Sequence, residues 1–264
     1  MEVAVLQMQV AFGQPEKNTA KLHRLAAQAM EQQPDVLLLP ELWLTGFYPR
    51  PIHPYAASNG QKTCALLSAL AQKYQVNVIG GTIPSLLGDK VFNTSYIFNR
   101  QGQLITTYQK THLFSPSGEG EDFTAGNNLI TFTLDGVKCG ILVCYDVRFP
   151  EASRQLALEG ISLLFIPAAW PLKRLTHWQA LTRARAIENQ LFVVTCNAAG
   201  TDGGGQKLAG HSAIIDPWGE ILAEAGAEET ILQGNIQLAI QSQIRETINV
   251  FADRRPSIYK KTPN

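Results

Sequence analysis

This sequence of 264 residues lacks several features that mark particular classes of protein. Lys and Arg number 22, and Asp and Glu also number 22, so no net charge attracts a polyanion. No basic patch is interleaved with aromatic residues in the way that nucleic-acid binding requires. No apolar run approaches the ~20 residues of a membrane-spanning helix. We therefore expect neither nucleic acid nor a membrane as a partner.

Cysteine is scarce as well. The four cysteines, Cys64, Cys139, Cys144 and Cys196, lie far apart and show neither metal-site spacing nor a Cys-x-x-Cys redox motif. A chain of this length needs no disulfide framework, so we expect free thiols, no metal and a reducing cytoplasm. The first ten residues carry no basic region, which indicates a first strand rather than a signal peptide.

What the sequence contains is an alternation of short apolar runs with longer amphipathic stretches. The short runs are rich in β-branched and aromatic residues and predict strands, whereas the amphipathic stretches predict helices. Strands are expected at 3–8, 35–39, 76–80, 91–98, 103–108, 137–143, 162–166, 192–197 and 211–215. Helices are expected at 17–32, 61–75, 150–159 and 176–190. This alternation favours an α/β architecture.

Two local patterns refine the prediction. Residues 99–102 (Asn-Arg-Gln-Gly) form a hairpin signal between two expected strands, so part of the sheet should be antiparallel. In the helix at 176–190, Thr176 is the expected N-cap. One apolar stripe should be buried there, formed by Ala180, Leu181, Ala184, Ile187 and Leu191. No linker or repeat divides the chain, so we expect one domain, 1–264, with an irregular tail from about 240.

Cys144 has the most informative surroundings. It ends the apolar run 137–143, shortly before Pro150 and Glu151 begin an expected helix. A strand-to-helix turn of this kind lies at the carboxyl edge of a sheet, where α/β proteins place ligands and nucleophiles. A free cysteine is also commonly an inert core residue, so this segment alone leaves both interpretations open.

Two further charged residues follow buried strands in the same way. Glu41 comes after the run 35–39 and Pro40, and Lys110 closes the strand at 103–108. If all three side chains converge on one sheet edge, they supply a base, a cation and a nucleophile for acyl transfer. Taken singly, Glu41 could cap a strand or helix, and Lys110 could be a surface lysine.

These segments resemble the Glu, Lys and Cys motifs of the nitrilase superfamily. The resemblance rests on Leu39-Pro-Glu41-Leu-Trp43, Tyr108-Gln-Lys110-Thr-His-Leu-Phe114 and Cys144-Tyr-Asp-Val-Arg-Phe-Pro-Glu151, and continues through 165–171, 183–190 and 210–219. It implies a nitrilase-like four-layer α-β-β-α sandwich with mixed sheets. It also implies hydrolysis of non-peptide carbon–nitrogen bonds without metal or organic cofactor, by a homodimer or larger homo-oligomer.

The chemistry of these side chains agrees with that resemblance. A free cysteine has a pKa of about 8.5, so a nearby base or cation is needed to form the thiolate. Glu41 would take the proton, Cys144 would attack an amide carbonyl, and Lys110 would stabilise the oxyanion together with the backbone N–H of Tyr145. Glu41 would then activate water to hydrolyse the resulting thioester.

Many members of the superfamily place a second glutamate between the Lys and Cys motifs. In the acidic, glycine-rich segment 114–126, the position counted back from Phe123-Thr-Ala-Gly126 is Glu119, and Glu121 is the alternative. Either glutamate could instead belong to a solvated loop.

Several residues are candidates for the walls of a substrate pocket. The aromatic candidates are Phe47, Tyr48, Tyr145 and Trp170, for which the alternative is ordinary packing. Arg148 and Arg174 are candidates for binding a substrate carboxylate, although Arg148 and Glu151 could instead pair or anchor the turn after Cys144. His112 invites pairing with Cys144, but a structural hydrogen-bonded role is expected. Cys139 and Cys196 are expected in the core.

Within the superfamily, three segments resemble those of bacterial ω-amidases, which deamidate 2-oxoglutaramate and 2-oxosuccinamate. They are Glu41-Leu-Trp-Leu-Thr-Gly46, Ala168-Ala-Trp-Pro171 and Arg185-Ala-Ile-Glu-Asn-Gln190. The substrates expected on this basis are a small amide and water. The alternatives are an N-carbamoyl-amine hydrolase, a deaminated-glutathione amidase or a silent scaffold, because the catalytic side chains are shared. The tail at 245–259 resembles the family's tail, which often crosses a dimer interface, but it could pack on its own subunit.

Overall fold

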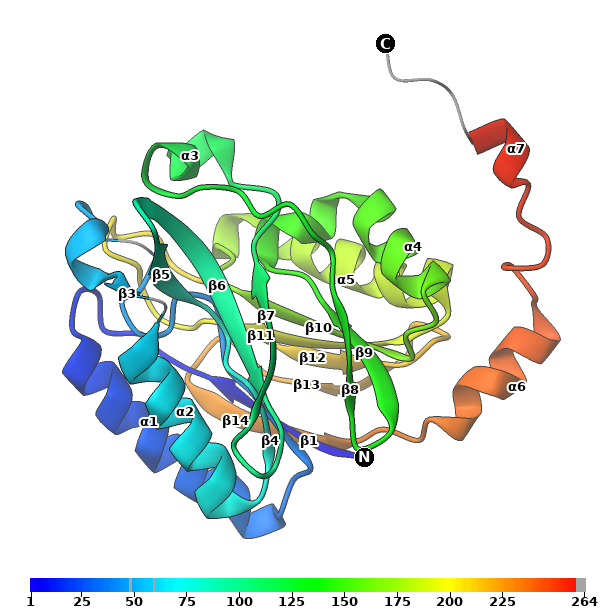
Figure 1. The fold of residues 1–264 in the computed structure, drawn as a ribbon. Coiled ribbons are helices and arrows are strands. Elements are labelled where there is room, and N and C mark those ends of the chain that lie inside the picture. Colours follow the sequence, from blue (N-terminus) through cyan, green and yellow to red (C-terminus); the bar gives the residue numbers. More distant parts are fainter. Residues whose placement is uncertain (48, 59, 260–264) are drawn as a thin grey trace.

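A computed structural model describes residues 1–47, 49–58 and 60–259. Two sheets lie face to face, with helices on their outer sides (Figure 1). The first contains β14 (Thr230–Asn235), β1 (Glu2–Gln7), β2 (Val36–Leu38), β4 (Asn77–Ile79), β6 (Lys90–Phe98), β5 (Ile83–Leu87) and β3 (Ala57–Ser58), in that order, with β7 (Leu104–Gln109) beside β6. The second contains β13 (Ile221–Glu224), β12 (Ala213–Ile215), β11 (Phe192–Asn197), β10 (Leu163–Ala168), β9 (Val137–Ile141) and β8 (Thr131–Leu134).

Both sheets mix parallel and antiparallel pairs, so the predicted sandwich with mixed sheets is confirmed. Helices α1 (Pro15–Ala29) and α2 (Gln61–Tyr74) cover the first sheet, and α4 (Pro150–Leu158) and α5 (Leu175–Asn189) cover the second (Figure 1). The short helix α3 (Glu119–Asp122) lies near the ends of β5 and β6. Helices α6 (Ala239–Thr247) and α7 (Pro256–Tyr259) follow the last strand.

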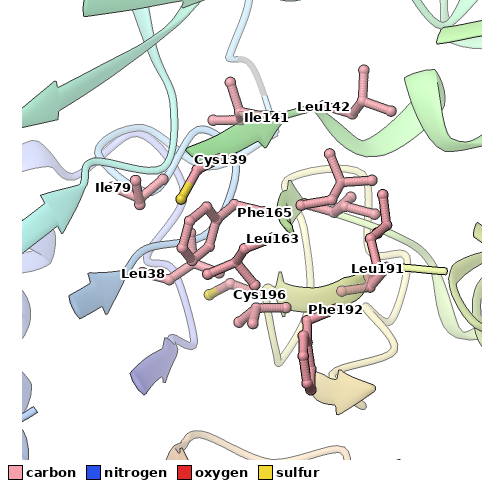
Figure 2. Packing of buried hydrophobic residues seen from close by; sticks show 14 of the residues in the cluster. Leu38, Ile79, Cys139, Ile141, Leu142, Leu163, Phe165, Leu191, Phe192 and Cys196 are labelled. Atoms are coloured by element: carbon pink, nitrogen blue, oxygen red, sulfur yellow. The ribbon is translucent and has the colours of Figure 1, made fainter. Parts of the chain in front are cut away.

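The strands appear as continuous apolar runs because both of their faces are buried. In β1, Val3 and Val5 belong to the core between the sheets, whereas Ala4 and Leu6 pack with residues of α1 and α2. Figure 2 shows the inner core, where Leu38 and Ile79 of the first sheet lie opposite residues of the second. Cys139 and Cys196 belong to this core, as predicted.

Every expected strand is present, and the hairpin at 99–102 is confirmed. Asn99 donates its backbone N–H to Gln103, and Gly102 has the positive φ of +74° that this turn requires. The strands that the sequence pattern missed are β3, β5, β8, β13 and β14. Among these, β5 contains Pro84, and β13 is largely exposed, so neither has the pattern of a buried strand.

The stripe predicted to be buried on α5 was only partly right: Leu191 is buried and Leu181 packs against the core, but Ala180 and Ile187 are exposed. Ile187 is 47% exposed, whereas the buried face carries polar residues, among them Arg185 and Asn189. Arg185 donates to the carbonyl of Val147, and Asn189 donates to Ser153 of α4. The buried face is polar because it supports the turn after Cys144 by hydrogen bonds. The helix begins at Leu175, without a side-chain cap.

The tail from about 240 is not irregular, because α6 and α7 form there. Its first part packs on its own chain: Gln241 donates to the carbonyl of Gln190, and the Gln190 side chain donates to the carbonyl of Ile248. Figure 1 shows α6 and α7 projecting beyond the edge of the sandwich. Within the described ranges, no helix is long and apolar enough to cross a membrane.

Candidate active site

Glu41, Lys110 and Cys144 lie at the ends of strands from the two facing sheets. Glu41 follows β2, Lys110 follows β7, and Cys144 begins the 3-10 helix η4 (Cys144–Arg148) after β9. The backbone N–H of Glu41 donates to the carbonyl of Ala168 at the end of β10, at 3.4 Å. The chain therefore gathers these residues where the two sheets meet.

Lys110 lies between two carboxylates. Its Nζ is 2.8 Å from Oε1 of Glu41 and 2.9 Å from Oε2 of Glu119, and none of these side chains is exposed. Burial alone would lower the pKa of Lys110, but the charges of Glu119 and Glu41 outweigh it and raise that pKa well above the ordinary value. Lys110 therefore stays cationic over the whole physiological range.

The structure separates the two candidates for the second glutamate. Glu119 is buried at the start of α3 and accepts the backbone N–H of Phe114 at 2.6 Å. The side chain of Glu121 is 73% exposed and pairs with Arg50 on the surface. The glutamate beside Lys110 is therefore Glu119.

The thiol of Cys144 lies within the influence of this cluster. Burial raises its pKa well above the ordinary value, and the charge of Glu41 raises it further, whereas Lys110 and the backbone N–H of Ala169 act in the opposite direction. The same N–H of Ala169 donates to Oε2 of Glu41 at 3.0 Å. Taken together, these groups favour the protonated thiol.

The turn that carries Cys144 is fixed by Asp146. The fully buried Asp146 carboxylate accepts the backbone N–H groups of Val143 and His112 and the hydroxyls of Tyr108 and Thr111, at 2.8–3.0 Å. His112 Nδ1 also contacts it, at 2.8 Å, so His112 has the structural role that was expected. This network ties η4 to the end of β7.

A pocket reaches Cys144 from the surface. Its wall includes the predicted residues Phe47, Tyr145, Arg148, Trp170 and Arg174, together with Phe114, Ala169, Pro171 and Gln206, which the sequence pattern did not indicate. Tyr48 lies outside the described residues. The wall thus combines aromatic rings with two guanidinium groups.

Both arginines lie against aromatic rings of this wall. The guanidinium of Arg148 is 4.7 Å from the ring of Trp170, and that of Arg174 is 5.0 Å from the ring of Phe114. In the described part of the chain neither forms an ion pair with a carboxylate, so the suggested pairing of Arg148 with Glu151 was wrong. Burial lowers the pKa of Arg174, and the charge of Arg148 acts in the same direction.

The sequence pattern also missed Asn93. This residue of β6 is fully buried, and its amide contacts both carboxylates that hold Lys110. A polar run, Asn93-Thr-Ser95, inside an otherwise apolar strand was the available signal. The residues that the structure describes include no group of three or more His, Cys, Asp or Glu that could hold a metal ion.

Comparison with known proteins identifies the family. The carbon-nitrogen hydrolase model matches residues 2–246. The chain is 41% identical to the 2-oxoglutaramate amidase of Bacillus subtilis, over 97% of this chain and 98% of that protein. It is 40% identical to the 2-oxoglutaramate amidase of Paenarthrobacter nicotinovorans, over 85% of this chain and 80% of that protein.

A solved structure is similar as well. Nit3 of Saccharomyces cerevisiae, from branch 10 of the nitrilase superfamily, has a TM-score of 0.88 at 31% identity, with 94% of each chain covered. The chain therefore belongs to the carbon-nitrogen hydrolase family, in which it is an amidase that acts on linear amides.

Proposed function

We propose that this protein hydrolyses the ω-amide of a small 2-oxo acid, such as 2-oxoglutaramate or 2-oxosuccinamate, and releases ammonia. The observation that carries the proposal is the pocket at Cys144, which presents two arginines without carboxylate partners in the described ranges. A substrate with an amide at one end and a carboxylate at the other matches this combination. Two relatives are named 2-oxoglutaramate amidase, which supports the same substrate.

The first half of the reaction forms a thioester. Oε2 of Glu41 takes the proton from Cys144, and the sulfur attacks the amide carbon. Lys110 and the backbone N–H of Tyr145 stabilise the tetrahedral oxyanion, an effect worth about 3–4 kcal/mol for each such donor. The carbon–nitrogen bond then breaks, and Glu41 returns its proton to the departing ammonia.

The second half of the reaction hydrolyses the thioester. Glu41 accepts a proton from water, and the resulting hydroxide attacks the thioester carbon. The carbon–sulfur bond breaks, the acid leaves, and the proton on Glu41 restores the thiol of Cys144. Glu119 touches Lys110 rather than Cys144, so we assign it to holding the lysine. A thiol nucleophile must stay reduced, which favours the cytoplasm as the working compartment.

The arginines provide the test of this substrate. Removal of a charge-assisted hydrogen bond to the substrate carboxylate should raise KM for 2-oxoglutaramate by about 10- to 100-fold. The experiment compares Arg174→Met and Arg148→Met with the wild type on 2-oxoglutaramate, on butyramide and on an N-carbamoyl amine. We expect at least one variant to lose affinity for 2-oxoglutaramate while its KM for butyramide changes little. Equal changes for both amides in both variants, or wild-type turnover of the N-carbamoyl amine alone, would refute the proposed substrate.

A further inference from the structure

Asn93 contacts the three charged residues of the buried cluster, Glu41, Lys110 and Glu119. Its Nδ2 is 2.9 Å from Oε1 of Glu41 and 3.2 Å from Oε1 of Glu119. Its backbone carbonyl accepts the N–H of Lys110 at 2.9 Å. The side chain is fully buried on β6. One neutral residue thus joins three charged ones.

The chemistry of the site fixes the orientation of the Asn93 amide. If the amide were turned over, Oδ1 would lie against two carboxylate oxygens, which are acceptors only. In the present orientation Oδ1 has no hydrogen-bond partner among the described residues. An unsatisfied buried oxygen is unfavourable, and the two hydrogen bonds from Nδ2 to the carboxylates compensate for it. The side chain of Asn93 therefore acts here purely as a donor.

The charges of the cluster do not balance without neutral donors. Two carboxylates and one ammonium leave one negative charge in a fully buried place, and unpaired buried charge is strongly unfavourable. Backbone N–H groups of Phe114 and Ala169 supply part of the compensation. In the described structure, Asn93 is the neutral side chain that donates to both carboxylates.

The two oxygens of Glu41 have different surroundings. Oε1 accepts from Lys110 and from Asn93, whereas Oε2 accepts from the backbone N–H of Ala169. Two donors on Oε1 hold the carboxylate in one orientation. Oε2 accepts the same Ala169 N–H that acts on the Cys144 thiol, so it is the oxygen on the side of the sulfur.

We propose that Asn93 is a positioning residue that holds the carboxylates of Glu41 and Glu119 around Lys110 and so directs Oε2 of Glu41 to the proton of Cys144. This inference rests on the proposed function, because it takes Cys144 as the nucleophile and Glu41 as its base. Asparagine suits the position because its amide offers two N–H groups without charge. Aspartate there would add a third negative charge, and serine would offer a single donor.

Thiol alkylation tests the inference without any substrate. Iodoacetamide modifies Cys144, and peptide mass spectrometry measures the rate at a series of pH values. The resulting pH profile of the rate is compared between the wild type, Asn93→Ser and Asn93→Asp. The titratable groups that face the cluster are Glu41, Lys110, Glu119 and Cys144, with Arg174 acting on the thiol from the pocket wall. Asn77→Ser is the matched control, because Asn77 is a buried asparagine of β4 whose amide donates to the remote Asp135 at 2.7 Å.

The acidic limb is the low-pH part of the profile, where the alkylation rate of Cys144 rises with pH. Asn93→Ser should move this limb to higher pH by about one unit, because a carboxylate that loses a hydrogen-bond donor is less stable in its ionised form. Asn93→Asp should move it further. On 2-oxoglutaramate, kcat should fall roughly 10- to 100-fold while KM stays within about threefold, since the lost hydrogen bond is not to the substrate. Asn77→Ser should lower the melting temperature but leave the pH of the acidic limb unchanged.

A folded Asn93→Ser protein with an unchanged acidic limb and unchanged kcat would overturn the inference. A fall in melting temperature alone, equal to that of Asn77→Ser, would likewise reduce Asn93 to a structural residue. The proposed function fails separately: if the wild type does not hydrolyse 2-oxoglutaramate but the limb still moves, the substrate is wrong and the role of Asn93 stands.

Discussion

At the scale of single residues, the site combines a strained cysteine, Cys144, with a crowded glutamate, Glu41, which we propose as nucleophile and base. Cys144 has a φ of +48°, a left-handed conformation that is unfavourable for a residue with a side chain. Such a conformation persists only where the surroundings impose it, as the hydrogen bonds of Asp146 do here. Gly81 lies next to the base: its φ is +56°, and a Cβ there would come within 2.1 Å of the carbonyl of Pro40. At both positions the backbone conformation sets where a side chain lies, that of Cys144 itself and that of Glu41 beside Gly81.

Lys110→Met should show how the buried charges depend on one another. The variant lacks the cation between Glu41 and Glu119 and one oxyanion donor, so we expect kcat/KM to fall roughly 100- to 1,000-fold. Two buried carboxyls then face each other without the cation that they share in the wild type, so the free energy of unfolding should fall by about 3–5 kcal/mol.

Urea unfolding of both proteins measures the effect. A Lys110→Met protein with the wild-type free energy of unfolding would show that the lysine does not compensate the carboxylates.

At the scale of elements, the loop-to-helix transition at η4 depends on one carboxylate. Asp146 accepts hydrogen bonds from the end of β9 and from the residues after β7, so two strands of different sheets share it. The ring of His112 stacks on Phe149 at 3.8 Å and closes the far side of this junction. The position of Cys144 is therefore set by contacts between elements.

Asp146→Ala should destabilise the fold by about 2–4 kcal/mol, because several buried donors lose their acceptor. It should also lower the alkylation rate of Cys144, since η4 loses its anchor. Asp216→Ala is the control: Asp216 is a buried turn residue that accepts the N–H groups of Trp218 and Glu220, far from the pocket. If both variants lose stability but keep wild-type thiol reactivity, Asp146 has no part in placing the nucleophile.

Asp35 gives an element-level prediction for pH. It accepts the N–H of Glu2 in β1 and pairs with Arg100 of the β6–β7 hairpin. Burial would raise its pKa, but the Glu2 hydrogen bond and Arg100 outweigh it and lower the pKa below 3.8. A depressed carboxyl pKa contributes stability that is complete above the unfolded value and is lost as pH falls through the folded value.

Asp35→Asn should therefore melt at a lower temperature than the wild type at pH 7. The loss of stability should be about 1 kcal/mol, because solvent screens the partly exposed pair of Asp35 and Arg100. The difference should shrink below about pH 4 and vanish in stronger acid. Calorimetry at both pH values measures it, and a difference that persists unchanged in acid would contradict the assignment.

Sequence patterns predicted the elements far better than the contacts between them. The apolar strands and the Asn99–Gly102 hairpin follow from local propensity, and the resemblance at Glu41, Lys110 and Cys144 located the cluster. The buried face of α5 could not be predicted, because Arg185 and Asn189 are buried by partners on distant segments. Asn93 was missed for the same reason, since a polar residue within a strand gives no sign of which groups it meets.

At the scale of the whole molecule, the site exists only where the two sheets face each other. β2 and β7 of the first sheet supply Glu41 and Lys110, and β9 and β10 of the second lead to Cys144 and Ala169. Buried hydrogen bonds join the layers, including the one from Ser212 to Gln7 of β1 at 2.8 Å. Docking of the two sheets and assembly of the site are therefore one event.

The outer side of the second sheet has an exposed apolar patch, which we define as Ile187, Trp218 and Ile221. Their exposed fractions are 47%, 46% and 42%, and Ile187 contacts the turn at Gly219. Exposed apolar side chains are typical of interfaces, and the homo-oligomer implied by the resemblance stays a prediction that this patch can test.

Sedimentation velocity should show a dimer for the wild type and dissociation for Ile187→Glu. Leu87→Glu, on an exposed leucine at the end of β5, should leave the dimer intact. A monomeric wild type, or equal dissociation in both variants, would rule out this patch as the interface.

The most direct test of the whole account is ammonia release from 2-oxoglutaramate by the wild type and by Cys144→Ala, measured side by side with confirmation that both are folded. The account predicts wild-type turnover that the substitution abolishes, because the thioester cannot form without the sulfur. Turnover that survives in Cys144→Ala would contradict the proposed nucleophile, and a wild type inactive on this substrate would contradict the proposed function.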